Sequence, residues 1–193
     1  MIIDTLLGMT LINENKNHFK TFVWRITATH TIAYFAAGIF ALLVLKYNET
    51  FGVGILSFMR PTDSSWVAAG AGLQIIRGAL LALFLYPFST IFINTKKGWV
   101  KFWLLSFGLS YLLTFSAAIG SFEGFIYTNF PMRYHLLGIP EVLLYLTLFT
   151  ILMWGWYKKP KKIFNTLSVI SVLLIALMSA MGALASLGII ETA

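Results

Sequence analysis

One arginine stands in the middle of a segment that is otherwise apolar enough to cross a membrane, GLQIIRGALLAL at residues 72–83. Arg77 lies eleven residues after Trp66, which corresponds to about 16 Å along a helix. This position is close to the middle of a bilayer, where insertion scales assign an arginine a cost of roughly 2.5–3.5 kcal/mol. A charge at that depth is by default a hypothesis of a functional site, and its chemistry would be the binding of an anionic group.

Three further polar side chains have the spacing needed to accompany Arg77. Gln74 precedes Arg77 by three residues, so the two share one face of a helix. His30 and Tyr34 are four residues apart in an earlier apolar segment and share a face in the same way. We expect both faces to point into the interior of a helical bundle, where Arg77 holds an anionic group and the other three orient it. His30 could instead hydrogen-bond a neighbouring helix as a neutral imidazole, with no further role.

A guanidinium in the membrane needs an anionic or strongly accepting partner, because an unpaired charge is far costlier than a paired one. Glu141 is the first choice, since a long arginine side chain could extend toward it, and Glu123 is the second. If neither is near enough, the partner is a bound anion or a network of ordered waters. Glu141 also has a purely structural explanation, because it follows Pro140 at the start of a predicted helix, where negative charge favours the helix dipole.

The segment from residue 120 to residue 141, GSFEGFIYTNFPMRYHLLGIPE, is a second concentration of polar side chains. Glu123, His135 and Glu141 could line a mouth above Arg77 that opens to the outside, and they could take part in acid–base chemistry. No metal site is predicted, because the sequence has no His-Glu-x-x-His motif and no aspartate-rich cluster. It also lacks a P-loop, a dinucleotide fingerprint and any cysteine, so no cofactor is expected.

The elements that must position these residues are membrane-spanning helices. The chain has 193 residues, 59% of them hydrophobic and only 11% charged, which is too little charge to cover a soluble domain of this length. Apolar runs long enough to cross about 30 Å of hydrocarbon recur along it. We predict an all-α integral membrane protein and a single membrane domain over residues 1–193. Its bundle of five transmembrane helices is placed at residues 26–45, 66–93, 102–120, 139–157 and 163–190.

The basic residues predict the orientation of this bundle. Ten of the fourteen lysines and arginines fall on the same side of the membrane as the N-terminus: Lys16, Lys20, Arg25, Lys96, Lys97, Lys101, Lys158, Lys159, Lys161 and Lys162. Short basic loops stay in the cytoplasm, so the N-terminus is cytoplasmic and the C-terminus external, in a plasma membrane of the bacterial inner-membrane type. Juxtamembrane anchors that touch anionic lipid heads explain the net charge of +7, and no nucleic-acid partner is expected.

The segments outside the core of the bundle carry further predictions. Residues 1–21 place apolar side chains on one helical face, which predicts a short cytoplasmic helix on the membrane surface. Both outer loops contain apolar stretches, FGVGILSFM and FIYTNFPMRYHLL, which predict an outer loop cap folded back over the helices. Residues 163–190 are rich in small residues, which favours tight packing within the bundle, or else against another copy of the chain or a protein partner.

Three functions are compatible with this pattern. The preferred one is an outward-facing intramembrane polar pocket that binds or transports a small anionic or amphipathic ligand, because polar stripes on several helices point to one interior. The first alternative is a non-catalytic accessory subunit of a membrane complex, in which Arg77 forms a structural pair with a glutamate. The second alternative is an intramembrane enzyme that acts on a lipid-like substrate, which requires an acid–base pair that includes His30 or His135.

Overall fold

The computed structural model of the chain describes the backbone of residues 2–190 and the side chains of residues 18–190. Within residues 2–190 every regular element is helical, and no strand occurs. The longer helices are α1 (Ile2–Leu43), α3 (Ser65–Leu85), α5 (Gly98–Phe107), α8 (Ile139–Lys158) and α9 (Lys162–Ser186). The short elements are α2 (Tyr47–Thr50), η1 (Gly54–Leu56), η2 (Tyr86–Phe88), α4 (Ser89–Ile93), η3 (Gly108–Leu112), α6 (Phe122–Tyr127) and α7 (Met132–Leu137).

Four helical stretches of the described chain are long and apolar enough to cross a membrane. They are His18–Leu43, Ser65–Ile93, Met132–Lys158 and Lys162–Ser186. Their outer faces carry large apolar side chains that the chain itself leaves uncovered, among them Phe84, which is 76% exposed, and Leu173, which is 64% exposed. A water-soluble domain of this size rarely exposes so much apolar surface, so these helices indicate a membrane protein.

The third predicted span is where sequence and structure differ. Residues 102–120 do not form one continuous helix, because the helix that begins at Gly98 ends with η3 at Leu112. The ten residues of α5 and the five of η3 rise about 22 Å, which is less than the hydrocarbon thickness of about 30 Å. The prediction of five spans is therefore not confirmed, whereas the other four predicted spans correspond to long helices.

Local contacts explain why the helix stops although the sequence stays apolar. Side-chain hydroxyls offer the backbone partners outside a helix. Thr114 donates to the carbonyl of Ser116 at 2.9 Å, and Ser121 donates to that of Ala118 at 2.7 Å. Gly120 then adopts φ +89°, and a Cβ atom there would lie 2.2 Å from the hydroxyl of Tyr111. The chain folds back at this glycine because only glycine fits this close approach.

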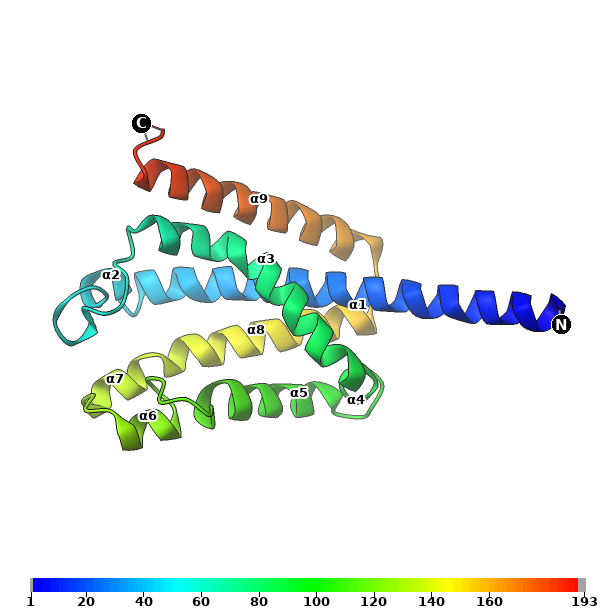
Figure 1. Cartoon of the computed structure of the whole chain (residues 1–193), viewed down its shortest axis with the longest axis horizontal. Coiled ribbons are helices and arrows are strands. Elements are labelled where there is room, and N and C mark those ends of the chain that lie inside the picture. Colours follow the sequence, from blue (N-terminus) through cyan, green and yellow to red (C-terminus); the bar gives the residue numbers. More distant parts are fainter. Residues whose placement is uncertain (1, 191–193) are drawn as a thin grey trace.

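Helix α1 runs through the centre of the bundle and packs against α3, α8 and α9, whereas α5 packs against α8 (Figure 1). Small residues let α3 approach both of its neighbours. A Cβ atom on Gly78 would lie 2.9 Å from the Cα atom of Thr27 in α1. On the other side, the hydroxyl of Ser179 in α9 donates to the carbonyl of Ala68 at 2.6 Å. The small residues of α9 thus pack within the chain, and a partner at this helix stays a prediction.

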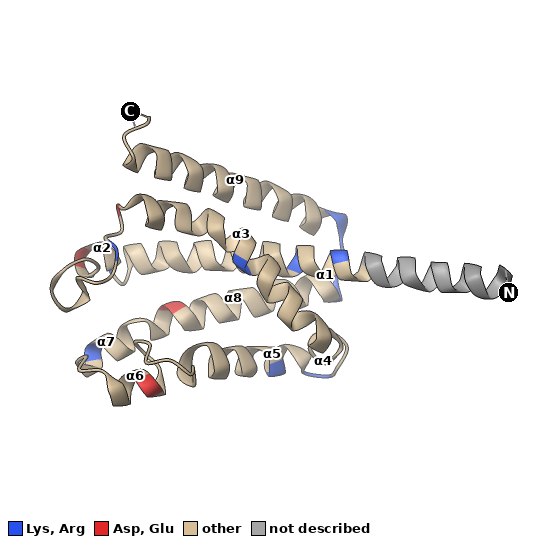
Figure 2. Cartoon of the chain, viewed as in Figure 1, with Lys and Arg blue, Asp and Glu red and all other residues tan. Residues whose placement is uncertain are grey.

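The two ends of the bundle differ in charge and in structure (Figure 2). The loop before α5 and the loop before α9 lie at one end, which we term the basic end. The short elements α2, η1, α6 and α7 lie at the opposite end and form what we term the cap. Its two loops meet where the rings of Phe58 and Phe130 lie 5.7 Å apart, and Leu56 is buried beneath them. The two apolar loops therefore contact each other at this end of the bundle, and its position outside the membrane stays a prediction. The predicted surface segment, residues 1–21, falls mostly outside the described side chains.

Candidate functional site

His30 forms the centre of a polar cluster between α1, α3 and α8. Its ring is fully buried, with Nε2 3.1 Å from Oε1 of Gln74 and Nδ1 2.6 Å from the hydroxyl of Tyr145. Because an amide oxygen only accepts, a neutral His30 ring carries its hydrogen on Nε2 and accepts from Tyr145. The amide nitrogen of Gln74 donates to the carbonyl of Gly70 at 3.2 Å, which fixes the orientation of the amide. The cluster is fully hydrogen-bonded at its centre.

Arg77 lies beside this cluster rather than inside it. Gln74 and Gly78 are buried against α1, and Arg77 occupies the flank of α3 with an exposed side chain. Its Nη1 atom donates to Oε1 of Gln74 at 3.5 Å, and its Cζ atom lies 5.9 Å from the ring centre of Tyr34. Both contacts are near the limit of what counts as an interaction. The expectation that Arg77 points into the bundle interior is therefore wrong in part: it lies at the rim, because the inward face of α3 is taken by Gln74 and Gly78.

The predicted ion pair of Arg77 with Glu141 is not formed. Among the residues whose side chains the structure describes, no carboxylate lies within 4.0 Å of the guanidinium, so Glu123, the second choice, does not pair with it either. Glu141 instead accepts a hydrogen bond from the hydroxyl of Tyr47 at 2.8 Å. Burial raises the pKa of the Tyr47 phenol, and the nearby Glu141 carboxylate raises it further, so the phenol stays a donor.

Arg77 and Glu141 nevertheless face one cavity. It has a volume of about 160 Å³ and lies between α1, α3, η3 and α8. Tyr34, Tyr111 and Tyr145 line it together with the two charged residues. Because Arg77 is itself exposed, the cavity reaches the surface of the bundle beside α3. At about 30 Å³ per water molecule, the space suits a small anionic group with a few waters.

Two neighbouring cavities meet this one at Glu141. A groove of about 480 Å³ runs between α1 and α3, and Tyr34 and Glu141 line both the groove and the Arg77 cavity. The rest of the groove is largely apolar, with Phe35, Ile39 and Trp66 among its walls. A third cavity of about 220 Å³ lies under the cap and shares Glu141 with the other two. Glu141 thus lines all three cavities.

Two predicted site residues do not join this arrangement. His135 is buried in the cap between the rings of Phe125 and Phe130, at 5.9 and 6.2 Å, and its Nδ1 atom accepts from the backbone of Gly120 at 3.2 Å. Glu123 lies in the first turn of α6. Neither lines the cavities described above. The predicted mouth with His135 and Glu123 is therefore not formed, because their segment folds as a separate corner of the cap.

Three tyrosines of the site, Tyr47, Tyr111 and Tyr145, were not among the predicted site residues. Tyr145 had a signal, because it follows Glu141 by one helical turn and so shares its face. Tyr47 had none, since it lies in a short helix after the first span. Tyr111 enters the cavity through η3, where the amide of Leu113 donates to the carbonyl of Gly108 five residues earlier at 2.7 Å. Such π-turns are difficult to predict from sequence and are frequent at functional sites.

Comparisons with protein-family models, with curated proteins and with solved structures give no match. A functional assignment therefore depends on the residues of the chain alone.

Proposed function

We propose that this chain is a multi-pass plasma-membrane protein that binds or transports a small anionic or amphipathic ligand, with Arg77 as the anion site. One observation carries the proposal. Arg77 stands near the middle of the apolar stretch Ser65–Ile93, lines a cavity, and has no carboxylate partner among the described side chains. A guanidinium at that depth is costly without an anion, so a ligand with an anionic group would supply the missing partner.

The polar groups around Arg77 suit the orientation of its guanidinium, because the Gln74 oxygen accepts from Nη1 and leaves the other guanidinium hydrogens for an anion. Gln74 is held by His30 and by the carbonyl of Gly70, so its oxygen is a fixed point beside the guanidinium. Tyr145 is held by the same histidine. A prearranged set of polar groups loses little conformational entropy when a ligand binds, which favours affinity.

An amphipathic ligand fits the cavities better than a fully polar one. The groove between α1 and α3 adjoins the Arg77 cavity through Tyr34 and Glu141, and its apolar walls could hold a hydrocarbon portion. Opposite charges at the two sides of the cavity, Arg77 and Glu141, favour a ligand that combines an anionic group with a hydrogen-bond donor. Such a ligand could enter from the membrane, since Arg77 is exposed at the side of the bundle.

The orientation in the membrane is part of the same proposal. The excess of lysine and arginine at the basic end favours a cytoplasmic position for that end. The cap and Glu141 would then lie in the external half, and the C-terminus outside. The accessory-subunit alternative would need Arg77 closed off by a carboxylate. The enzyme alternative would need a catalytic pair that includes His30 or His135 at a shared opening.

A binding titration tests the proposal. The probe is cis-parinaric acid, a fluorescent fatty acid with one carboxylate, added to the purified full chain in neutral bicelles. We expect saturable binding, weakened about tenfold or more in Arg77→Gln, because the hydrogen bonds to a charged group are lost. Arg133→Gln is the matched control, since Arg133 is exposed on the cap and its removal changes the net charge equally. Equal binding by the wild type and both variants would contradict the proposed anion site.

A further inference from the structure

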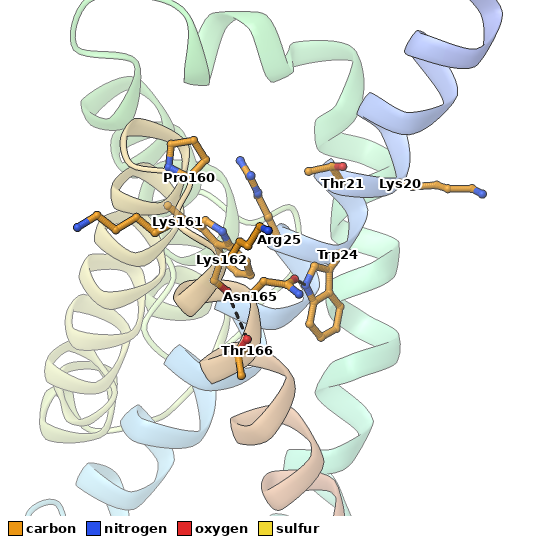
Figure 3. A pocket seen from close by; sticks show the side chains of 10 residues that line it. Lys20, Thr21, Trp24, Arg25, Pro160, Lys161, Lys162, Asn165 and Thr166 are labelled. Carbon is orange, nitrogen blue, oxygen red and sulfur yellow. Dashed lines mark hydrogen bonds between the residues drawn. The ribbon is translucent and has the colours of Figure 1, made fainter.

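A fourth cavity lies at the basic end, and it shares no lining residue with the Arg77 cavity. It has a volume of about 610 Å³ and lies between α1, the end of α8 and the start of α9 (Figure 3). Its lining includes Lys20, Trp24, Arg25, Lys161, Lys162 and Asn165. It therefore joins segments from the two ends of the sequence.

All the charged side chains that line this cavity, which we term the basic pocket, are cationic. Four of its described lining residues are lysine or arginine, and no described lining residue is aspartate or glutamate. The guanidinium of Arg25 lies 4.6 Å from the ring centre of Tyr157 and 5.5 Å from that of Trp156, so its position is held by two aromatic rings. Like charges held close together repel one another, and a bound anion would relieve that repulsion.

The shape of the basic pocket is fixed by a contact between helices. The indole nitrogen of Trp24 in α1 donates to the side-chain oxygen of Asn165 in α9 at 2.7 Å. Figure 3 shows Arg25 and Lys162 in the space above this contact, while Lys20 and Lys161 extend away on opposite sides. Two cations are thus placed at the centre, and two flexible ones stand at the edges within reach of a ligand that arrives from outside.

The position along the helices indicates the source of the anion. The pocket lies where α8 ends at Lys158 and α9 begins at Lys162, which is the boundary between hydrocarbon and head groups if these helices cross a membrane. Tryptophan rings prefer this boundary, and both Trp24 and Trp156 line the pocket. On α9, exposed Val169 and Leu173 follow Thr166 by three and seven residues, so they continue from the pocket as an apolar stripe on the same face. A ligand with a phosphate head and hydrocarbon tails matches both parts.

We infer that the basic pocket binds the phosphate head group of an acidic phospholipid. Arg25 and Lys162 contact the phosphate, Lys20 and Lys161 close over it, and the acyl chains lie along the exposed face of α9. Arginine and lysine at the membrane surface recognise lipid phosphate through charge and hydrogen bonds. The inference depends on the chain crossing a membrane but not on the ligand proposed for Arg77.

Native mass spectrometry of the full chain in neutral detergent tests the inference, with phosphatidylglycerol as the acidic lipid and phosphatidylcholine as the neutral one. The test variant is the triple substitution Lys20→Gln, Lys161→Gln and Lys162→Gln. The matched control is Lys96→Gln, Lys97→Gln and Lys101→Gln, which removes the same charge from exposed lysines near the same end. We expect the test variant to bind phosphatidylglycerol at least about tenfold more weakly than the wild type. The control variant should bind phosphatidylglycerol as the wild type does, and binding of phosphatidylcholine should be the same in all three proteins.

Three outcomes would overturn the inference. Equal losses of phosphatidylglycerol binding in the test and control variants would show that the lipid is attracted to the basic end as a whole rather than to the basic pocket. Equal binding of phosphatidylcholine would show that charge is not recognised. Displacement of the lipid by inorganic phosphate at matched ionic strength would assign the pocket to free phosphate. Arg25→Lys provides a further check, because it keeps the charge and should retain lipid binding, whereas Arg25→Gln should lose it.

Discussion

Two arginines lie inside the long apolar helical stretches, Arg25 in His18–Leu43 and Arg77 in Ser65–Ile93, and the deeper of the two is the less buried. Arg25 is near the basic end, yet it is half-buried and lies over the rings of Trp156 and Tyr157 at 5.5 and 4.6 Å. Arg77 is near the middle of its helix, yet it is exposed and lies over one ring, that of Tyr34, at 5.9 Å. The arginine that the membrane would penalise more is the one that the chain covers less.

This contrast separates two quantities that are often treated as one. Depth along a helix sets how far a charge is from water, whereas burial in the bundle sets how many protein groups can replace that water. Arg25 lies over two aromatic rings and close to the aqueous boundary, so the rings and water stabilise its charge whether or not a lipid is bound. Arg77 has a weak contact with Gln74 and a distant ring, so its partner must come from outside the described side chains. This difference is what favours the ligand proposed at Arg77.

The largest expected effect on stability comes from Gly78, the residue at which α3 approaches α1 most closely beside Arg77. In Gly78→Ala the new Cβ atom would lie 2.9 Å from the Cα atom of Thr27, a backbone atom that cannot rotate away. We expect the free energy of unfolding to fall by about 3 kcal/mol, measured by denaturant titration in bicelles. The His30–Gln74 contact beside Arg77 would be lost, whereas the surroundings of Arg25 would persist.

Gly70→Ala is the control for that substitution, because no atom lies within 4 Å of a Cβ built on Gly70 in the same helix. It should leave stability unchanged or raise it by about 0.5–1 kcal/mol, as alanine favours a helix over glycine. If both glycines tolerate alanine equally, α3 does not depend on Gly78 to approach α1.

The second-largest effect is that replacing the two arginines should change the free energy of unfolding in opposite directions. Arg77→Met should raise the free energy of unfolding in neutral bicelles without ligand by about 2 kcal/mol, because a costly charge leaves the apolar region. Arg25→Met should lower it by about 1 kcal/mol, because two cation–π contacts are lost. Thermal unfolding followed by circular dichroism measures both variants under one condition. Destabilisation by Arg77→Met would instead show that the guanidinium already has a stabilising partner in the folded chain.

The same comparison shows what a sequence can reveal about such a site. Gln74 and Arg77 share a face, as do His30 and Tyr34, because spacing within one helix follows directly from its period. The meeting of these two faces was also foreseeable, since Gly78 and other small residues favour a close approach of α3 to another helix. The exposure of Arg77 was not foreseeable, because it depends on which helix packs beside α3.

The predictions that the structure does not confirm have the same origin. The pair of Arg77 with Glu141 failed because Tyr47, from a short helix outside the spans, donates to that carboxylate. The third span is not confirmed, because the end of its helix depends on Gly120 meeting Tyr111, two residues that lie in different turns of the folded chain. Hydropathy describes the preference of a segment for the membrane, but it carries no information about contacts of this kind.

The smallest effect concerns Glu141, the acidic residue that faces the Arg77 cavity. Tyr47→Phe removes the 2.8 Å hydrogen bond to its carboxylate and should lower the free energy of unfolding by about 1.5 kcal/mol. Because burial raises the pKa of Tyr47, this contribution is fully present below about pH 10 and is lost only above it. The difference between wild type and variant should therefore be constant from neutral pH to about pH 9 in denaturant titrations.

The control for this variant is Tyr127→Phe, because Tyr127 is 73% exposed on the cap. It should change stability very little, by about 0.5 kcal/mol at most. Loss of the Tyr47 hydroxyl also leaves Glu141 able to turn toward Arg77 across their shared cavity. Weaker binding of cis-parinaric acid by Tyr47→Phe would then follow, since the carboxylate would compete with the ligand for the guanidinium. Unchanged binding together with unchanged stability would show that Tyr47 does not hold Glu141 away from Arg77.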